Sequence, residues 1–436
     1  MKNVLIVTYF FPPCNCVSSE RPKSYAEHFK KYGLSPTVVT RHWAGNETGN
    51  SAEFSLPNQD PPKITRNEDY TLVQLPYLVE KNQLLQRLTP IRRFVNLINT
   101  ALGNFSSQEN TNKAFYDFLN AYLKENQVDY LMVVSAPLNV IKLGHRLAKE
   151  FNLTLIADFI DLWDNGLLSA DYKPNWDTKL RNFFYEFYLQ RWLKSASLIT
   201  SVSGGMIEQI ERIRPGAKTM VVMNGFEEEP EELNIESSNS INPKFTFSVM
   251  GALYPQQDLS ILIEGLQLFL KDKNLAEIQL DFIGTAAFPQ VKSFLEENLP
   301  KECTSVTARI PFEQAKRKTR ESHVLFYAGW KGYKGLPSAK IYGYLGARRN
   351  ILIAPSDHDM LAEIISETEA GKTTDSPAEF AQILNDWFRE WKTTGELTYR
   401  GKPEKIDFYS WENQARLFAE EIKKMNNKAA DKINNG

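Results

Sequence analysis

Residues 334–355, KGLPSAKIYGYLGARRNILIAP, predict a turn, a helix and a buried strand in succession. Ser338 follows the turn and is a favourable helix N-cap. Apolar residues such as Ile341 and Leu345 recur at helical spacing, and the apolar run 351–353 is typical of a buried strand. A helix N-terminus behind a glycine-containing loop favours an anion, because free N–H groups and the helix dipole point at it.

The same alternation of strand and helix recurs along most of the 436 residues. Apolar strands are expected at residues 3–10, 35–41, 70–76, 128–136, 153–160, 197–203 and 218–224. Helices are expected near 18–33, 112–125, 138–151, 177–197 and 204–213, with an irregular polar stretch at about 43–70. After a segment rich in Glu, Asn and Ser the pattern restarts at residue 245. This order favours parallel sheets covered by helices on both faces.

We therefore predict an α/β protein with two Rossmann-like domains facing each other across a cleft. The expected parts are an N-terminal domain (1–226), a linker (227–243), a C-terminal domain (244–405), a closing helix (406–426) and a polar, frayed tail (427–436). Ligands of such sheets bind beyond the carboxyl ends of the strands, so the strand-end loops are the expected site.

Composition excludes several classes of protein. The hydrophobic content of 42% indicates a globular chain, and the net charge of −2 gives no reason to expect a nucleic-acid partner. Three cysteines predict no disulfide framework, and no Cys/His set accompanies Cys14 and Cys16 to complete a soft-metal site. The first apolar stretch is broken by prolines and predicts a buried strand, and no run approaches the ~18 apolar residues of a spanning helix. A cytoplasmic location is expected.

Motifs of other nucleotide and hydrolytic enzymes are missing from the sequence. It holds no G-x-x-x-x-G-K-[ST] loop, no G-x-G-x-x-G after a strand, no G-x-S-x-G elbow and no H-E-x-x-H pair. The five histidines are scattered. Nucleotide-sugar chemistry and a two-lobed binding protein remain as the leading hypotheses.

Several strings, in this order along nearly the whole chain, carry a family resemblance. They are VTYFFPP (7–13), IADFIDLWDN (156–165), VVMNGFE (221–227), FSVMGALYPQQDLSILIEGL (247–266), GLPSAKIYGYLGARRNILIAP (335–355) and FYSWENQARLFAEEI (408–422). Together they resemble bacterial GT-B glycosyltransferases of the family-four type. The resemblance implies a retaining, metal-independent transfer of a sugar from a nucleotide-diphosphate sugar, with no cofactor. The implied acceptor is a glycan or a polyprenyl-linked sugar of surface-polysaccharide synthesis.

The resemblance also implies where the ligands bind. The donor would lie on the C-terminal domain, at Gly251, Tyr254, Ile310, Lys334, Ser338, Ala339, Lys340 and Gly343. In the N-terminal domain, Asp161 is the candidate catalytic residue, with Asp158 and Trp163 as neighbours. Asn15 and Arg21 would serve the acceptor or phosphate side, the alternative for Arg21 being an ordinary surface residue.

The sequence departs from the family at the donor site. The two glutamates that hold the donor sugar and ribose are replaced by Gly335 and Gly343, and the Arg/Lys pair after Gly251 is absent. Glu227, Lys331 or Lys334 are candidate substitutes. A different donor, a non-catalytic scaffold that binds glycan or nucleotide, and a nucleotide-sugar epimerase remain open as alternatives.

Two amphipathic stretches predict either ordinary core faces or peripheral contact with the inner membrane face. The first, 88–102, has the apolar residues Ile91, Phe94, Val95, Ile98 and Leu102 near Arg87, Arg92 and Arg93. The second, 177–196, mixes Phe183, Phe184, Phe187 and Trp192 with Arg181, Arg191 and Lys194.

Overall fold

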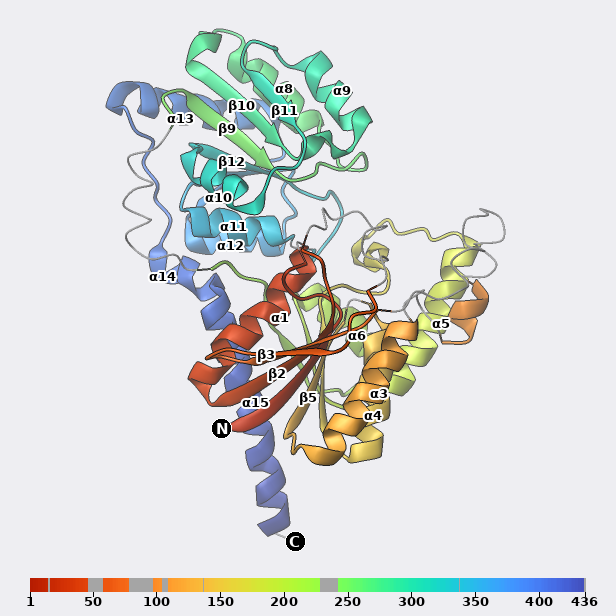
Figure 1. The fold of residues 1–436 in the computed structure, drawn as a ribbon. Helices are drawn as coiled ribbons and strands as arrows, with labels where there is room; N and C mark the ends of the chain where they lie inside the picture. The colour runs from red at the N-terminus through yellow and green to blue at the C-terminus, as the bar shows by residue number, and fades with distance from the viewer. Residues whose placement is uncertain are drawn as a thin grey trace. The chain divides into compact units, whose positions relative to one another are not determined.

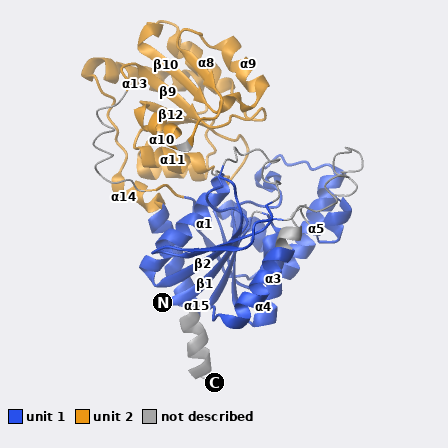
Figure 2. Ribbon diagram, in the orientation of Figure 1, with its two compact units in different colours: residues 1–224, 411–436 blue, residues 225–410 orange. Residues whose placement is uncertain are grey.

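The computed structural model describes residues 1–14, 16–45, 58–77, 97–103, 109–135, 137–227, 242–336 and 338–434. The chain divides into two compact units (Figure 2). Unit 1 comprises residues 1–224 and 411–436, and unit 2 comprises residues 225–410. Each unit has its own sheet covered by helices (Figure 1).

The sheet of unit 1 has the strand order β3-β4-β2-β1-β5-β6-β7-β8. All neighbouring strands are parallel except β3, which runs antiparallel to β4. The strands are β1 (Lys2–Thr8), β2 (Leu34–Arg41), β3 (Lys63–Arg66), β4 (Thr71–Leu75), β5 (Tyr130–Ser135), β6 (Thr154–Phe159), β7 (Ala196–Ser201) and β8 (Thr219–Val221). The central strands β5 and β6 are buried almost throughout, because helices cover both faces.

The α-helices of unit 1 are α1 (Val17–His28), α3 (Glu109–Glu125), α4 (Asn139–Phe151), α5 (Trp176–Trp192), α6 (Gly204–Ile213) and α15 (Trp411–Asn434). Short 3₁₀ turns are η1 (Phe29–Tyr32), η4 (Asn165–Leu168) and η5 (Leu193–Ser195). The helix expected over 177–197 therefore ends at Trp192 and passes through η5 into β7.

The C-terminal helix α15 is part of the core of unit 1. It lies beside α1 (Figure 1), and the Phe418 ring contacts the rings of Tyr25 and Phe29 at centroid distances of 5.2 and 5.9 Å. Ile422 is buried in the same cluster. The helix has the bounds Trp411–Asn434.

The sheet of unit 2 has the order β11-β10-β9-β12-β13-β14, and all of its strands are parallel. The strands are β9 (Phe245–Met250), β10 (Ile278–Ile283), β11 (Thr304–Thr307), β12 (Val324–Ala328), β13 (Asn350–Ala354) and β14 (Gly371–Thr373). In order of sequence this is 3-2-1-4-5-6, the strand order of dinucleotide-binding Rossmann domains. The expectation of Rossmann-like units is thus confirmed here.

The α-helices of unit 2 are α8 (Ser260–Leu270), α9 (Pro289–Asn298), α10 (Phe312–Glu321), α11 (Ala339–Ala347), α12 (Met360–Thr368), α13 (Pro377–Thr394) and α14 (Pro403–Ile406). Its 3₁₀ turns are η6 (Leu275–Glu277), η7 (Thr285–Ala287) and η8 (Asp407–Tyr409).

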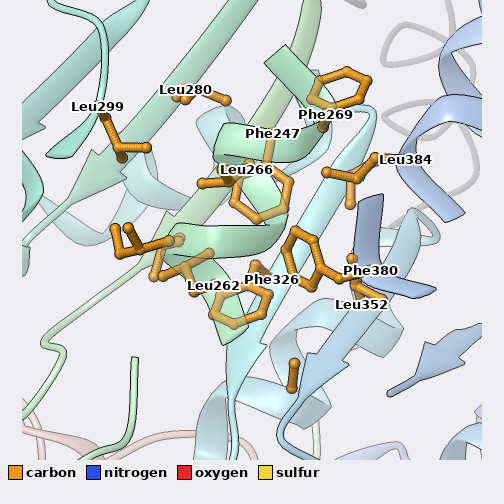
Figure 3. Close-up of a cluster of buried hydrophobic side chains, with 14 of the residues drawn as sticks. Phe247, Leu262, Leu266, Phe269, Leu280, Leu299, Phe326, Leu352, Phe380 and Leu384 are labelled. Atoms are coloured by element: carbon orange, nitrogen blue, oxygen red, sulfur yellow. The ribbon is translucent and has the colours of Figure 1, made fainter. Parts of the chain in front are cut away.

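The core of unit 2 forms between its sheet and the helices α8 and α13 (Figure 3). Phe247 and Phe326 from the sheet stack at 5.6 Å, and Phe380 of α13 packs against both. Gly265 of α8 lies so close to Phe380 that an added Cβ would be 2.5 Å from the ring atom Cδ1. The glycine therefore permits the two helices to pack closely.

Two strands, β3 and β14, were missed by the sequence, and part of the expected linker lies outside the described residues. β3 lies within the stretch 43–70 that was expected to be irregular. Its residues, Lys-Ile-Thr-Arg, are all exposed on an edge strand, so no apolar run marked it. Of the linker 227–243, residues 228–241 fall outside the described part of the chain. Among the described residues, no helix is long and apolar enough to cross a membrane.

Candidate functional site

The strand order of unit 2 reverses between β9 and β12, the position where parallel sheets of this kind bind ligands. These two strands pair only near their amino ends, at Phe247 with Val324 and Ser248 with Leu325. Beyond that point Tyr344 of α11 fills the gap. Its hydroxyl accepts a hydrogen bond from the Met250 N–H at 3.0 Å and donates one to the Phe326 carbonyl at 3.2 Å. These two hydrogen bonds hold the part of α11 around Tyr344 at this edge.

Two glycines turn the chain at the same edge. Gly251 ends β9 with φ 78° and Gly284 ends β10 with φ 82°, both in the left-handed region that favours glycine. A Cβ on Gly284 would lie 3.2 Å from the Cα of Gly251, so the two loops approach closely. A Cβ on Gly251 would lie 3.0 Å from Cε of Lys340. Glycine at 251 therefore leaves room for the lysine side chain.

Lys340 brings a positive charge to this edge from the first turn of α11. Its Nζ donates a hydrogen bond to the Ala252 carbonyl oxygen at 2.5 Å. Burial lowers the pKa of Lys340 to about 8. The ammonium is therefore charged at neutral pH but weakly solvated, a state that an anionic ligand would stabilise.

Four aromatic rings surround the loops that follow β9 and β12. Tyr254 lies 5.5 Å from Phe288 and 5.7 Å from Trp330, and Trp330 lies 5.5 Å from Tyr333, measured between ring centroids. We call these four residues the aromatic cluster. Gln257 joins the two loops, accepting from the Tyr254 N–H and donating to the Ala328 carbonyl. The side chain of Tyr254 is 42% exposed and offers a ring face at the edge of the sheet.

The N-terminus of α11 is built largely as the sequence predicted. Ser338 is the N-cap residue, although its side chain makes no capping hydrogen bond, and its N–H donates to the Tyr327 hydroxyl at 3.2 Å. Ala339 is the first helical residue, and Lys334 is exposed in the preceding loop. Ile310 is half-buried in the loop after β11, on the far side of β10 in the strand order.

The two glycines that stand where the family has glutamates differ from each other. Gly343 is exposed on α11, and a Cβ there would meet nothing within 4 Å. Gly335 is buried with φ 63°, and its N–H donates to the Asp359 carboxylate at 2.6 Å. A side chain is therefore sterically possible at 343 but conformationally strained at 335.

The candidate substitutes for these glutamates lie at separate places in unit 2. Lys331 is exposed and pairs with Asp258 at 3.8 Å, and Glu227 is half-buried. A cavity of about 430 Å³ lies between α9 and β11 and is lined by residues such as Glu297 and Thr304. Thr304 begins β11, so this cavity is at the amino ends of the strands and does not coincide with the site.

In unit 1, Arg21 has a buried position that the sequence did not predict. Its side chain is 1% exposed, and its Nε and Nη2 atoms donate to the two carboxylate oxygens of Asp158 at 2.8 and 2.7 Å. Asp158 also accepts from Thr200 Oγ1 at 2.5 Å and from the Tyr25 hydroxyl at 3.3 Å. Arg21 is thus neither a surface residue nor open to an acceptor. Its guanidinium pairs with Asp158 and so connects α1 to β6 and, through Thr200, to β7.

The same guanidinium also binds residues 222–224, where the chain passes from unit 1 into unit 2. Its Nη1 atom donates to the Val222 carbonyl at 2.7 Å and lies 3.3 Å from the Met223 carbonyl and 3.4 Å from Asn224 Oδ1. The side-chain oxygen of Gln414 in α15 accepts a hydrogen bond from the Met223 N–H at 3.0 Å. Arg21 therefore anchors the segment through which the chain leaves unit 1.

Asp161, the candidate catalytic residue, lies two residues beyond the end of β6 and is exposed. The surrounding protein raises the pKa of its carboxyl by desolvation, and a hydrogen bond from Asn165 opposes this shift. Trp163 is half-buried on the same loop, whereas Asn15 lies outside the described residues. An accessible carboxyl with a raised pKa is a feature of functional sites.

The sequence analysis missed an aromatic cage at the carboxyl ends of β1, β2 and β4. The Arg41 guanidinium lies 4.1 Å from the Trp43 ring and 3.8 Å from the Tyr77 ring and donates to the Tyr9 hydroxyl at 2.8 Å. Cation–π contacts of this kind are stronger when buried. The cage holds the loop after β1 against its neighbours. Aromatic residues directly after strand ends were the signal that could have indicated it.

Helix α5 exposes part of the face that was predicted as amphipathic. Phe183 and Phe187 are 61% and 53% exposed, and Trp176 is 73% exposed. Phe184 is half-buried, and Trp192 is buried and belongs to the core. Of the other predicted stretch, residues 88–96 lie outside the described residues, and so does Arg87; Ile98 and Leu102 are exposed.

No group of three or more His, Cys, Asp or Glu side chains capable of holding a metal occurs among the described residues. The strongest candidate site is therefore the carboxyl edge of the unit 2 sheet, with Lys340, the start of α11 and the aromatic cluster. The carboxyl edge of unit 1 supplies Asp161.

Comparison with known proteins found no matching family model and no matching curated protein. Solved structures are similar over nearly the entire chain. Sucrose-phosphate synthase from Thermosynechococcus elongatus is 12% identical with a TM-score of 0.63, covering 98% of this chain and 100% of that one. The E. coli trehalose-6-phosphate protein bound with UDP-2-fluoro glucose is 13% identical with a TM-score of 0.59, covering 97% and 99%. A glycosyltransferase from Rickettsia africae is 12% identical with a TM-score of 0.58, covering 97% and 98%.

The chain has the GT-B fold. The fold expected from the sequence motifs is thereby confirmed. Lys340 lies at the carboxyl edge of the unit 2 sheet, and Asp161 lies at the carboxyl edge of the unit 1 sheet.

We predict that Arg21→Met destabilises unit 1 by about 3–5 kcal/mol, because Asp158 would remain buried without its cation. Urea unfolding of the variant measures this loss, and Lys23→Met, which removes a half-buried lysine from the same helix, should cost no more than about 1 kcal/mol. The double variant Arg21→Met/Asp158→Leu should lose less than the sum of the two single variants, because neither charge remains. Unfolding of Arg21→Met at the wild-type urea concentration would contradict the assigned role.

Proposed function

We propose that this chain is a glycosyltransferase that takes a sugar from a nucleoside-diphosphate sugar held on unit 2. The observation that carries the proposal is the partly buried Lys340 ammonium at the edge where the strand order reverses. A lysine cation beside a helix N-terminus suits a diphosphate, because the charge and the N–H groups act on the same anion. The E. coli protein of the same fold, bound with UDP-2-fluoro glucose, supports this class of donor.

The proposed reaction needs stabilisation of the leaving diphosphate. As the acceptor hydroxyl bonds to the anomeric carbon, the bond from that carbon to the diphosphate oxygen breaks, and the hydroxyl proton passes to the diphosphate. Transfer on one face of the sugar retains its configuration. Lys340 and the start of α11 would stabilise the charge that develops on the leaving group, with no metal required.

The aromatic cluster would provide contact area for a ring of the donor. Tyr254 and Trp330 flank the loops after β9 and β12, and Tyr254 is exposed. Aromatic faces pack well against sugar rings and bases, whose apolar faces lose water on contact. Such stacking would supply part of the binding that the missing glutamates no longer give.

Unit 1 would hold the acceptor, with Asp161 as the polar group that orients the reacting hydroxyl. We place the acceptor among glycans or polyprenyl-linked sugars of bacterial surface-polysaccharide assembly, at the cytoplasmic face of the inner membrane. The exposed aromatic face of α5 supports a membrane contact, since Trp176, Phe183 and Phe187 share a helix face near Lys179 and Arg191.

A non-catalytic scaffold that binds nucleotide or glycan is the second candidate. The left-handed backbone at Gly335, which disfavours any side chain there, and the empty position at Gly343 favour it, because neither family carboxylate is replaced in place. Sugar transfer separates the transferase from the scaffold. Nucleotide binding separates the transferase from a protein that has no nucleotide site.

We predict that one class of nucleotide among UDP, GDP, CMP and dTDP, or their sugar conjugates, raises the melting temperature. A ligand at 100 times its dissociation constant adds about 2.7 kcal/mol, which corresponds to roughly 5–10 °C for a unit of this size. Lys340→Met should weaken this binding roughly 10- to 150-fold, the equivalent of a charge-assisted hydrogen bond. The matched control is Lys271→Met at the C-terminal end of α8, which should bind nucleotide as the wild type does.

The same binding should depend on pH in a defined direction. With a Lys340 pKa of about 8, the ammonium is lost as the pH rises through that value, so nucleotide affinity falls above it. In Lys340→Met this component of the pH dependence should be absent. Absence of a thermal shift with every nucleotide and conjugate would exclude both the transferase and the nucleotide-binding scaffold.

We predict that Asp161→Asn lowers the rate of sugar transfer by roughly 10²–10³-fold while donor binding is retained, because the carboxyl acts on the reacting groups. Because Asp161 is exposed, the variant should keep its fold and melt close to wild type. Asp171→Asn, exposed on the same loop, is the control. Equal transfer rates in Asp161→Asn and wild type would exclude Asp161 from the reaction.

We predict that Phe183→Ser/Phe187→Ser reduces sedimentation with vesicles that contain anionic phospholipid, because the exposed rings would enter the headgroup region. Leu268→Ser removes an exposed apolar side chain from unit 2 and should leave sedimentation unchanged. Raising the salt concentration should weaken wild-type binding through the nearby basic residues. If the phenylalanine variant sediments like wild type, α5 is not the membrane contact.

A further inference from the structure

Two thiols meet in the loop between β1 and α1. The Cys14 S–H donates to the Cys16 sulfur, with the two sulfur atoms 3.5 Å apart. Cys14 is 3% exposed, whereas Cys16 is partly exposed and is the N-cap residue of α1. One thiol is therefore accessible to a reagent in solution, and the other lies directly behind it.

The backbone holds the pair in place. The Cys16 N–H donates to the Cys14 carbonyl at 3.0 Å. The buried Ser19 hydroxyl lies 2.9 Å from the Cys14 carbonyl oxygen and 2.6 Å from that of Cys16. Both cysteines pack against the aromatic group that includes Tyr9 and Trp43. The separation of the sulfurs is thus set by several independent contacts.

The surroundings also favour the reactive form of Cys16. The adjacent Cys14 thiol lowers the pKa of Cys16, and the amides of Ser18 and Ser19 at the start of α1 act in the same direction. A thiolate is the nucleophile in disulfide exchange, and helix N-termini stabilise it. By contrast, burial raises the pKa of Cys303, the third cysteine, in unit 2.

We propose that Cys14 and Cys16 form a reversible dithiol–disulfide couple, in which Cys16 is the attacking thiol and Cys14 the resolving thiol. The couple lies in the loop that follows β1, the strand beside which the order of the unit 1 sheet reverses. The proposal concerns thiol chemistry alone and stands independently of sugar transfer.

The reaction partner is a small disulfide such as oxidised glutathione. The Cys16 thiolate attacks one glutathione sulfur, so that a mixed disulfide forms and one glutathione leaves as its thiolate. Cys14, after losing its proton to solvent, attacks the Cys16 sulfur and releases the second glutathione. The protein loses two hydrogen atoms, and the small disulfide becomes two thiols. Because the closed loop is very short, its entropic stabilisation is small and the disulfide should remain easily reduced.

The full chain is equilibrated in glutathione buffers from fully reduced to fully oxidised, quenched with acid and alkylated with a maleimide under denaturing conditions. Intact mass then gives the number of free thiols. We expect three alkylated cysteines in reduced buffer and one, Cys303, in oxidised buffer, with the loss of two hydrogens reversed by dithiothreitol. Cys303→Ser is the matched control and should form the same disulfide.

The single variants separate the two roles. Cys14→Ser should stop at a mixed disulfide and retain one glutathione on Cys16. Cys16→Ser should retain a thiol at buried Cys14, since no accessible partner precedes it. Three alkylated thiols in fully oxidised buffer would overturn the proposal. So would a wild-type chain that keeps a glutathione adduct as Cys14→Ser does, because Cys14 would then not resolve it.

Discussion

The buried ion pair of Arg21 and Asp158 is the constraint on which unit 1 depends. Two charges removed from water cost several kcal/mol each, and the cost is offset only when geometry and remaining hydrogen bonds are satisfied. Here the guanidinium meets both carboxylate oxygens, Thr200 occupies one of these oxygens as well, and the Val222 carbonyl takes a further N–H. Because those partners come from α1, β6, β7 and the exit of the unit, none of these elements can shift without leaving a charge unpaired.

Unit 2 fixes the corresponding edge by different means. The chain enters through Phe226, which packs on Gly346 of α11 and bridges to Ser410. The hydroxyl of Tyr344 then joins β9 to β12 where their own pairing stops. The Tyr344 hydroxyl is neutral, so β9 and β12 are joined here without the charge of Lys340. Its only hydrogen-bond acceptor among the described residues is the Ala252 carbonyl, so its charge is available to a ligand.

The sequence predicted what is local and missed what depends on distant partners. Apolar runs such as 351–353 and the N-cap at Ser338 gave strands and helices close to their true positions, because burial and capping act within a few residues. Arg21 stands in a polar helix sequence, SSERPK, and its partner Asp158 is 137 residues away, so no local pattern marks it as buried. The family motifs gave the fold, but the Arg41 cage likewise joins three strand ends that only the folded sheet brings together.

Under the proposed function, Gly335 and Gly343 restrict how a donor could be held at the carboxyl edge of the unit 2 sheet. At Gly335 the backbone has φ 63° and its N–H is taken by Asp359, so a glutamate there would require another loop conformation. At Gly343 a side chain would fit, yet glycine is present at a cost of about 1 kcal/mol relative to alanine in a helix. A donor bound there would therefore meet a bare helix surface where the glycosyltransferases that the sequence resembles have a carboxylate. Its binding free energy has to come from Lys340, from the N–H groups of α11 and from ring stacking, which selects for charge and flat faces rather than for ribose hydroxyls.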